Sequence, residues 1–263
     1  MHYIETAGAT VAYRVDGQGP GLVLIHGTGA DSQTNWDHLV GQFTPDWTVV
    51  RPDYSGSGGT QDQEEELTIG MLANQVMAAA NAAGAVPYDL VGYSLGACIA
   101  AYIAAEHPEQ VRSIVLLAGV TSGDSRLRLQ FELWRDLIRT DRRALARLVL
   151  LTGFSPDFLA GWSQQQIDET IEMILVTNRW EGMARQVELD LTLDIRQYVS
   201  RITQPALVIG CTHDHMVPSA HARALAASIP GARYVEMATG HLAPLERPDE
   251  FVQLTKDFLL SPN

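Results

Sequence analysis

The chain has 263 residues, of which 46% are hydrophobic and 19% charged, as is typical of a globular protein with a sizeable core. Its net charge of −13 argues against nucleic acid and anionic membrane surfaces as partners. There is no signal-peptide pattern and no apolar run long enough to span a membrane, so we expect a cytoplasmic protein. We expect it to be a monomer or a homodimer.

Up to residue 121 the sequence predicts strands alternating with helices. A hairpin over 3–6 and 11–15 turns at Gly8. Later strands are apolar runs, at 22–25, 47–50, 88–91 and 111–117. Helices are predicted over 36–43, 69–83 and 97–105.

The same alternation returns after residue 200, with strands at 206–209 and 234–237 and helices at 221–228 and 248–260. Such an order predicts the α/β class, a mainly parallel sheet covered by helices on both faces. The segment between these two regions, residues 122–200, lacks strand runs and carries helical patterns with many large apolar residues. We therefore predict a core of residues 1–121 and 201–263 and a helical lid of residues 122–200.

The segment Gly92-Tyr93-Ser94-Leu95-Gly96 fits the pattern G-x-S-x-G between a predicted strand and a predicted helix. This context is typical of a nucleophile elbow, a tight turn that exposes a serine hydroxyl. Side chains two residues to either side of the serine would collide in such a turn, which explains the two glycines. Ser94 is therefore the predicted nucleophile.

A serine nucleophile needs a histidine base and a carboxylate that orients it, here in the order Ser, Asp, His. Asp214 and His241 follow the two last predicted strands, so both loops reach the edge of the sheet where Ser94 lies. A helix cap for Asp214 and an ordinary surface position for His241 are the alternatives, and Asp124 is the other candidate acid. The histidines beside Asp214 have poor zinc spacing, so we expect no metal and no cofactor.

Acyl transfer also needs donors for the oxyanion. One is the backbone N–H of Leu95, directly after the nucleophile. The second is predicted in the loop after the 22–25 strand, at the N–H of Thr28 with Gly29 as the alternative, and the Thr28 hydroxyl could add a further donor. Asp53, in a loop rich in Gly and Ser, is predicted to organise a turn.

With these motifs the chain resembles the α/β-hydrolase superfamily over essentially its whole length. The resemblance implies a mainly parallel, eight-stranded sheet. The stretch from Ile229 to Glu246 and the loop 27–37 are similar to the 3-oxoadipate enol-lactonase and carboxylesterase group, which usually carries Asn-Ser where this chain has His26-Gly27. Esters and lactones are the substrates that this resemblance implies.

We accordingly predict a serine hydrolase that cleaves a small-molecule carboxylic ester or lactone through an acyl-enzyme. Ser94 attacks the carbonyl, His241 relays the proton and Asp214 fixes the imidazole. Carbon–carbon bond hydrolysis of a diketone-type substrate, a ligand receptor without turnover and acyl transfer to an acceptor other than water stay open. Residues predicted to line the substrate pocket, or alternatively only to pack the lid onto the core, are Tyr93, Phe131, Trp134, Phe154, Trp162 and Leu242.

Overall fold

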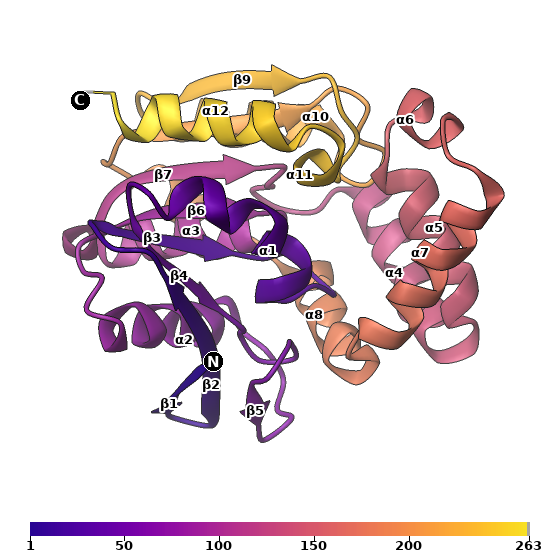
Figure 1. The fold of residues 1–263 in the computed structure, drawn as a ribbon, viewed down its shortest axis with the longest axis horizontal. Coiled ribbons are helices and arrows are strands. Elements are labelled where there is room, and N and C mark those ends of the chain that lie inside the picture. Colours follow the sequence, from indigo (N-terminus) through magenta and orange to yellow (C-terminus); the bar gives the residue numbers. More distant parts are fainter. Residues whose placement is uncertain (262–263) are drawn as a thin grey trace.

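A computed structural model describes residues 1–261, and its centre is one twisted sheet (Figure 1). The strand order is β1-β2-β4-β3-β6-β7-β8-β9, and the short β5 pairs with β2. β1 and β2 form the predicted antiparallel hairpin, β2 is antiparallel to β4, and every pair from β4 to β9 is parallel. The strands are β1 His2–Thr6, β2 Ala9–Asp16, β3 Gly21–Ile25, β4 Thr48–Pro52, β5 Gln61–Asp62, β6 Tyr88–Tyr93, β7 Val111–Leu117, β8 Ala206–Cys211 and β9 Arg233–Met237.

The mainly parallel sheet of eight strands is confirmed, and the two-residue β5, which was not predicted from the sequence, adds a ninth strand. β3 is buried along its whole length because helices cover both of its faces. Leu22 and Leu24 face one side and pack with apolar residues of α1 (Ser32–Phe43) and α12 (Pro248–Leu259). Val23 and Ile25 face the other side.

The opposite layer consists of α2 (Ile69–Ala82), α3 (Leu95–Glu106) and α10 (Ser219–Ser228), whose apolar faces pack against Val23 and Ile25 and their neighbours. A 3-10 turn, Pro108–Gln110, follows α3, and the short α11, Ala243–Glu246, precedes α12. Both cysteines, Cys98 on α3 and Cys211 on β8, are free and buried.

Six helices lie between β7 and β8, where the sequence predicts the lid, and α4 to α7 stand beyond one end of the sheet in Figure 1. They enclose their own apolar clusters, which include Trp134, Leu145, Leu150 and Trp180. We refer to residues 122–200, the predicted lid, as the cap. Its helices are α4 Ser125–Thr140, α5 Arg142–Gly153, α6 Pro156–Ala160, α7 Gln164–Thr177, α8 Trp180–Thr192 and α9 Arg196–Val199.

Candidate active site

Ser94 lies at the sharp turn between β6 and α3, with φ 56° and ψ −120°. Few residues other than glycine adopt this conformation, and the Ser94 N–H is held by the Leu117 carbonyl at 2.9 Å. A Cβ at Gly92 would lie 2.3 Å from the Gly96 carbonyl oxygen, and one at Gly96 would lie 2.3 Å from the Ile25 carbonyl oxygen. Backbone segments therefore pass too close for any side chain at either position.

The three residues predicted to carry the chemistry meet in one chain of hydrogen bonds. The Nε2 atom of His241 lies 3.1 Å from Ser94 Oγ, and its Nδ1 atom lies 2.6 Å from Asp214 Oδ2. A carboxylate only accepts hydrogen bonds, so Nδ1 carries the proton and Nε2 is free to accept from the Ser94 hydroxyl. The side chain of Asp214 is fully buried and that of His241 is 5% exposed, so water does not compete for this contact.

Asp214 also serves the turn that it begins. Its Oδ1 atom accepts the N–H groups of Met216 at 2.8 Å and Val217 at 2.7 Å, so the capping role and the contact with His241 coexist on separate oxygens. Asp124, the other candidate acid, caps α4 through the Leu127 N–H and lies 3.3 Å from His221 Nε2. Its carboxyl is engaged away from His241.

The loop after β3 presents backbone donors beside Ser94. The Gly29 N–H donates to Gln186 Oε1 at 2.9 Å, so the alternative oxyanion donor is already occupied. Within residues 1–261 the Thr28 N–H has no acceptor, and the N–H of Leu95, at the first position of α3, has none within the helix. The Thr28 hydroxyl donates to Asp190 Oδ2 at 2.7 Å. These contacts leave the N–H groups of Thr28 and Leu95 as the available pair.

Gln186 and Asp190 were not predicted from the sequence. They lie four residues apart on α8, on one face of the helix, and are 0% and 8% exposed. Burial raises the pKa of Asp190 to about 7. The only local signal is a pair of polar residues among the buried Met183, Val187 and Leu189, and nothing in that pattern names their partners, which lie more than 150 residues earlier in the chain.

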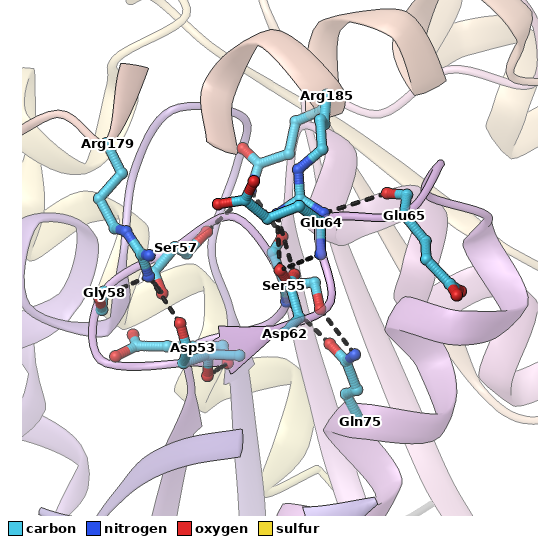
Figure 2. A network of polar contacts seen from close by, with 12 residues as sticks. Asp53, Ser55, Ser57, Gly58, Asp62, Glu64, Glu65, Gln75, Arg179 and Arg185 are labelled. Atoms are coloured by element: carbon cyan, nitrogen blue, oxygen red, sulfur yellow. Dashed lines mark hydrogen bonds and ion pairs between the residues drawn. The ribbon is translucent and has the colours of Figure 1, made fainter. Parts of the chain in front are cut away.

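Hydrogen bonds and an ion pair also join α8 and its N-cap residue to the segment between β4 and α2, as Figure 2 shows. Arg179 donates to the carbonyls of Gly58 at 3.0 Å and Thr60 at 2.6 Å, and Arg185 pairs with Asp62 at 2.9 Å. Asp53 accepts the N–H groups of Ser32 at 2.8 Å and Gly59 at 3.0 Å, which fits its predicted role in a turn.

A cavity of about 190 Å³, called the large cavity below, opens onto Ser94 and His241 beneath the cap. Its walls are mostly apolar and come from the cap helices, the loop after β3 and the loop after β9. Five of the six residues predicted for the pocket line it, namely Tyr93, Phe131, Trp134, Phe154 and Leu242. Trp162 does not, because its ring packs between α6 and α7 against Phe154 and Phe158, with ring centres 4.9 and 6.0 Å away.

Among residues 1–261, no group of three or more His, Cys, Asp or Glu side chains is arranged to hold a metal ion. None of the helices described there combines the length and the apolar character needed to cross a membrane.

The chain belongs to the α/β hydrolase fold family, whose sequence model matches residues 20–248. It is a hydrolase. It is 55% identical to the pyrrolizixenacetamide deacetylase of Xenorhabdus hominickii over 99% of this chain and 98% of that protein. Among solved structures it is similar to an enol-lactonase from Burkholderia xenovorans, with 28% identity, a TM-score of 0.88 and coverage of 99% of this chain and 100% of that one. A hydrolase from Pseudomonas aeruginosa has 26% identity, a TM-score of 0.88 and coverage of 99% and 98%.

Proposed function

We propose that this protein is a serine hydrolase that cleaves a carboxylic ester or lactone through an acyl-enzyme at Ser94. The observation that carries the proposal is the buried chain of hydrogen bonds from Ser94 Oγ through His241 to Asp214. It ends at the large cavity, which both Ser94 and His241 line. A hydroxyl, a base and an orienting carboxylate in this order are what acyl transfer to serine requires.

The first half of the reaction forms the acyl-enzyme. Ser94 Oγ attacks the substrate carbonyl carbon while its proton moves to His241 Nε2. The carbonyl oxygen becomes an oxyanion that the N–H groups of Thr28 and Leu95 stabilise. When the carbon–oxygen bond of the ester breaks, His241 delivers that proton to the departing alkoxide. Losing one oxyanion donor typically costs about 10²–10³ in turnover.

The second half restores the enzyme. A water molecule attacks the acyl carbon, His241 Nε2 takes its proton, and the same N–H groups hold the second oxyanion. Collapse returns the proton to Ser94 Oγ and releases a carboxylic acid. Asp214 keeps the proton of the imidazole on Nδ1 and stabilises the imidazolium in both halves. Each group is used twice, so the mechanism requires nothing beyond these residues and water.

Hydrolysis of an N-acetyl amide is the second candidate, and one observation favours it. The Xenorhabdus relative, 55% identical over nearly the whole chain, is named a deacetylase of an acetamide. An amide differs from an ester chiefly in its leaving group, because an amine must be protonated as it departs. His241 Nε2, which carries the proton from Ser94, is the group placed to supply it.

The test is rapid-quench mass spectrometry with an aryl acetate, an aryl acetamide and a lactone. We expect an acyl adduct on the peptide that contains Ser94, formed and consumed over many turnovers, and none in Ser94→Ala. A single slow turnover would instead indicate a ligand receptor. Retention of a tenth of the wild-type turnover by Ser94→Ala would exclude Ser94 as the nucleophile.

A further inference from the structure

A second cavity, called the small cavity below, lies beside Ser94 and has a volume of about 20 Å³. A space of this size holds roughly one water molecule or one methyl group. Its walls are mostly apolar apart from Ser94 and Asp190 of α8, and the apolar residues that line it include Leu127 of α4, Leu193 at the end of α8 and Cys98 of α3. These three side chains are buried, so the small cavity cannot extend past them without repacking.

The two cavities meet at the nucleophile. Ser94, Phe131 and Val217 line both of them, whereas His241 lines only the large one among residues 1–261. An acyl carbon bonded to Ser94 Oγ carries the leaving group on one side and the acyl chain on another. Since His241 must reach the leaving group to protonate it, the leaving group belongs in the large cavity. The small cavity is then the place left for the acyl chain.

We propose that the small cavity is the acyl subsite and that it selects an acetyl or similarly short acyl group on a bulky, apolar alcohol or amine. This rests on the proposed function and narrows it. A lactone carries its acyl carbon and its leaving oxygen in one ring, so its acyl chain and its leaving group cannot be divided between the two cavities. Open-chain acetyl esters and amides are therefore the substrate class, in preference to lactones.

Acyl chain length tests the assignment directly. With naphthyl esters of one alcohol, kcat/KM for the acetate should exceed that for the hexanoate by roughly 10- to 100-fold, because extra methylenes must displace packed side chains. Leu127→Ala and Leu193→Ala enlarge the small cavity and should each reduce this ratio by roughly tenfold or more. Val149→Ala, which enlarges only the large cavity, is the matched control and should leave the ratio unchanged.

A flat chain-length profile in the wild-type protein, or faster turnover of lactones than of open-chain acetates, would overturn the acyl subsite while leaving the serine mechanism intact. The wild-type series needs no variant, so misfolding of the alanine variants does not obscure the result. Failure of the proposed function gives a different outcome, in which no ester, amide or lactone is turned over and no Ser94 adduct forms.

A second set of contacts joins α8 to the loop after β3, and one of its residues, Asp190, also lines the small cavity. Gln186 accepts the Gly29 N–H at 2.9 Å, and its amide donates to Ser57 Oγ at 2.8 Å and the Ser55 carbonyl at 3.2 Å. One helical turn later, Asp190 accepts the Thr28 hydroxyl at 2.7 Å. The helix α8 also lies close to the loop after β4, because a Cβ at Gly182 would lie 2.1 Å from the Gly56 carbonyl oxygen.

From these contacts we infer that Gln186 and Asp190 are positioning residues for the oxyanion hole. Gln186 accepts the Gly29 N–H and Asp190 accepts the Thr28 hydroxyl, so the loop is fixed directly after the peptide that presents the Thr28 N–H. Preorganised donors stabilise a developing charge because they need not reorient during the reaction. The cap thereby completes the oxyanion hole as well as covering the large cavity.

Gln186→Met keeps the length of the side chain and removes its hydrogen bonds. We expect kcat to fall roughly 10- to 100-fold with KM nearly unchanged, and the inhibition constant of an aryl boronic acid, which forms a tetrahedral adduct on serine, to rise by the same factor. Arg185→Gln is the control, because it removes a bond between α8 and Asp62 without touching the loop after β3. It should lower the melting temperature and leave kcat unchanged.

Asp190 supplies an independent pair of variants. Asp190→Asn retains an oxygen that accepts the Thr28 hydroxyl, whereas Asp190→Leu does not, so the Asn variant should keep most of the kcat that the Leu variant loses. Unchanged kcat in folded Gln186→Met, or a loss of kcat without matching loss of boronic acid affinity, would reduce both residues to a purely structural role.

Discussion

Asp214 binds His241 with one carboxylate oxygen and the turn that holds it with the other. Oδ2 lies 2.6 Å from His241 Nδ1, while Oδ1 accepts two backbone N–H groups at 2.8 and 2.7 Å. The orientation of the carboxylate is therefore set by the backbone, and the tautomer of His241 follows from that orientation. Catalytic geometry here depends on a local turn that forms within a few residues.

Replacing Asp214 by Asn should reduce kcat by about 10⁴ with little loss of stability. The Asn oxygen can still accept from Met216 and Val217, but its amide then faces Nδ1 and favours the wrong tautomer of His241. Steady-state kinetics with an aryl acetate, together with a thermal melt, measures both effects. A loss smaller than tenfold would mean that the carboxylate of Asp214 is not what orients His241.

We expect the strained backbone conformation of Ser94 to lower the stability of the folded protein. A residue with a side chain at φ 56° and ψ −120° costs about 1–3 kcal/mol, which glycine avoids. Ser94→Gly should therefore be more stable than Ser94→Ala by about 1 kcal/mol or more, although both are inactive. Chemical denaturation of the two variants checks this, and equal midpoints would show that the elbow is unstrained.

The serine, aspartate and histidine were predictable because each follows a strand that its own apolar sequence reveals. Parallel strands bring their carboxyl ends to one edge, so three local patterns were enough to place Ser94, Asp214 and His241 together. The Thr28 loop was found in the same way. The sequence therefore predicts the fold, and it predicts those site residues that directly follow a strand.

Gln186 and Asp190 could not be found by that reasoning. Their role depends on how α8 of the cap docks on the loop after β3, a contact that joins residues 157 and 162 positions apart. Trp162 shows the same limit, since its large apolar ring fits a substrate pocket and a cap interior equally well. Only tertiary packing separates those two positions, and it places Trp162, partly buried, against an apolar cluster of the cap.

Gly96 should tolerate no side chain, because a Cβ there would lie 2.3 Å from the Ile25 carbonyl oxygen and 2.5 Å from that of His26. Gly96→Ala is expected to separate α3 from β3 and to yield little folded protein. Gly41→Ala is the matched control on α1, where a Cβ would meet nothing within 4 Å. That variant should gain about 1 kcal/mol in stability from the higher helix propensity of alanine. Normal folding of Gly96→Ala would contradict the close approach.

Asp190 should make stability depend on pH near neutrality. Burial raises the pKa of its carboxyl from 3.8 to about 7, so the folded protein binds this proton more tightly than the unfolded chain. Below the unfolded pKa both states are protonated and Asp190 costs nothing. As the pH rises from about 4 to 7 the unfolded chain ionises first, and the free energy of unfolding falls until both states are ionised.

Asp190→Asn removes this titration, so its stability relative to the wild type should improve by about 2–3 kcal/mol between pH 5 and pH 8. Denaturant unfolding of both proteins across that range measures the difference. Asp194→Asn should show no such trend, because hydrogen bonds from Arg196 lower the pKa of Asp194 and its titration lies below the range. Parallel curves for wild type and Asp190→Asn would mean that Asp190 is ionised in the folded protein throughout, and that the Thr28 hydroxyl always donates to a carboxylate.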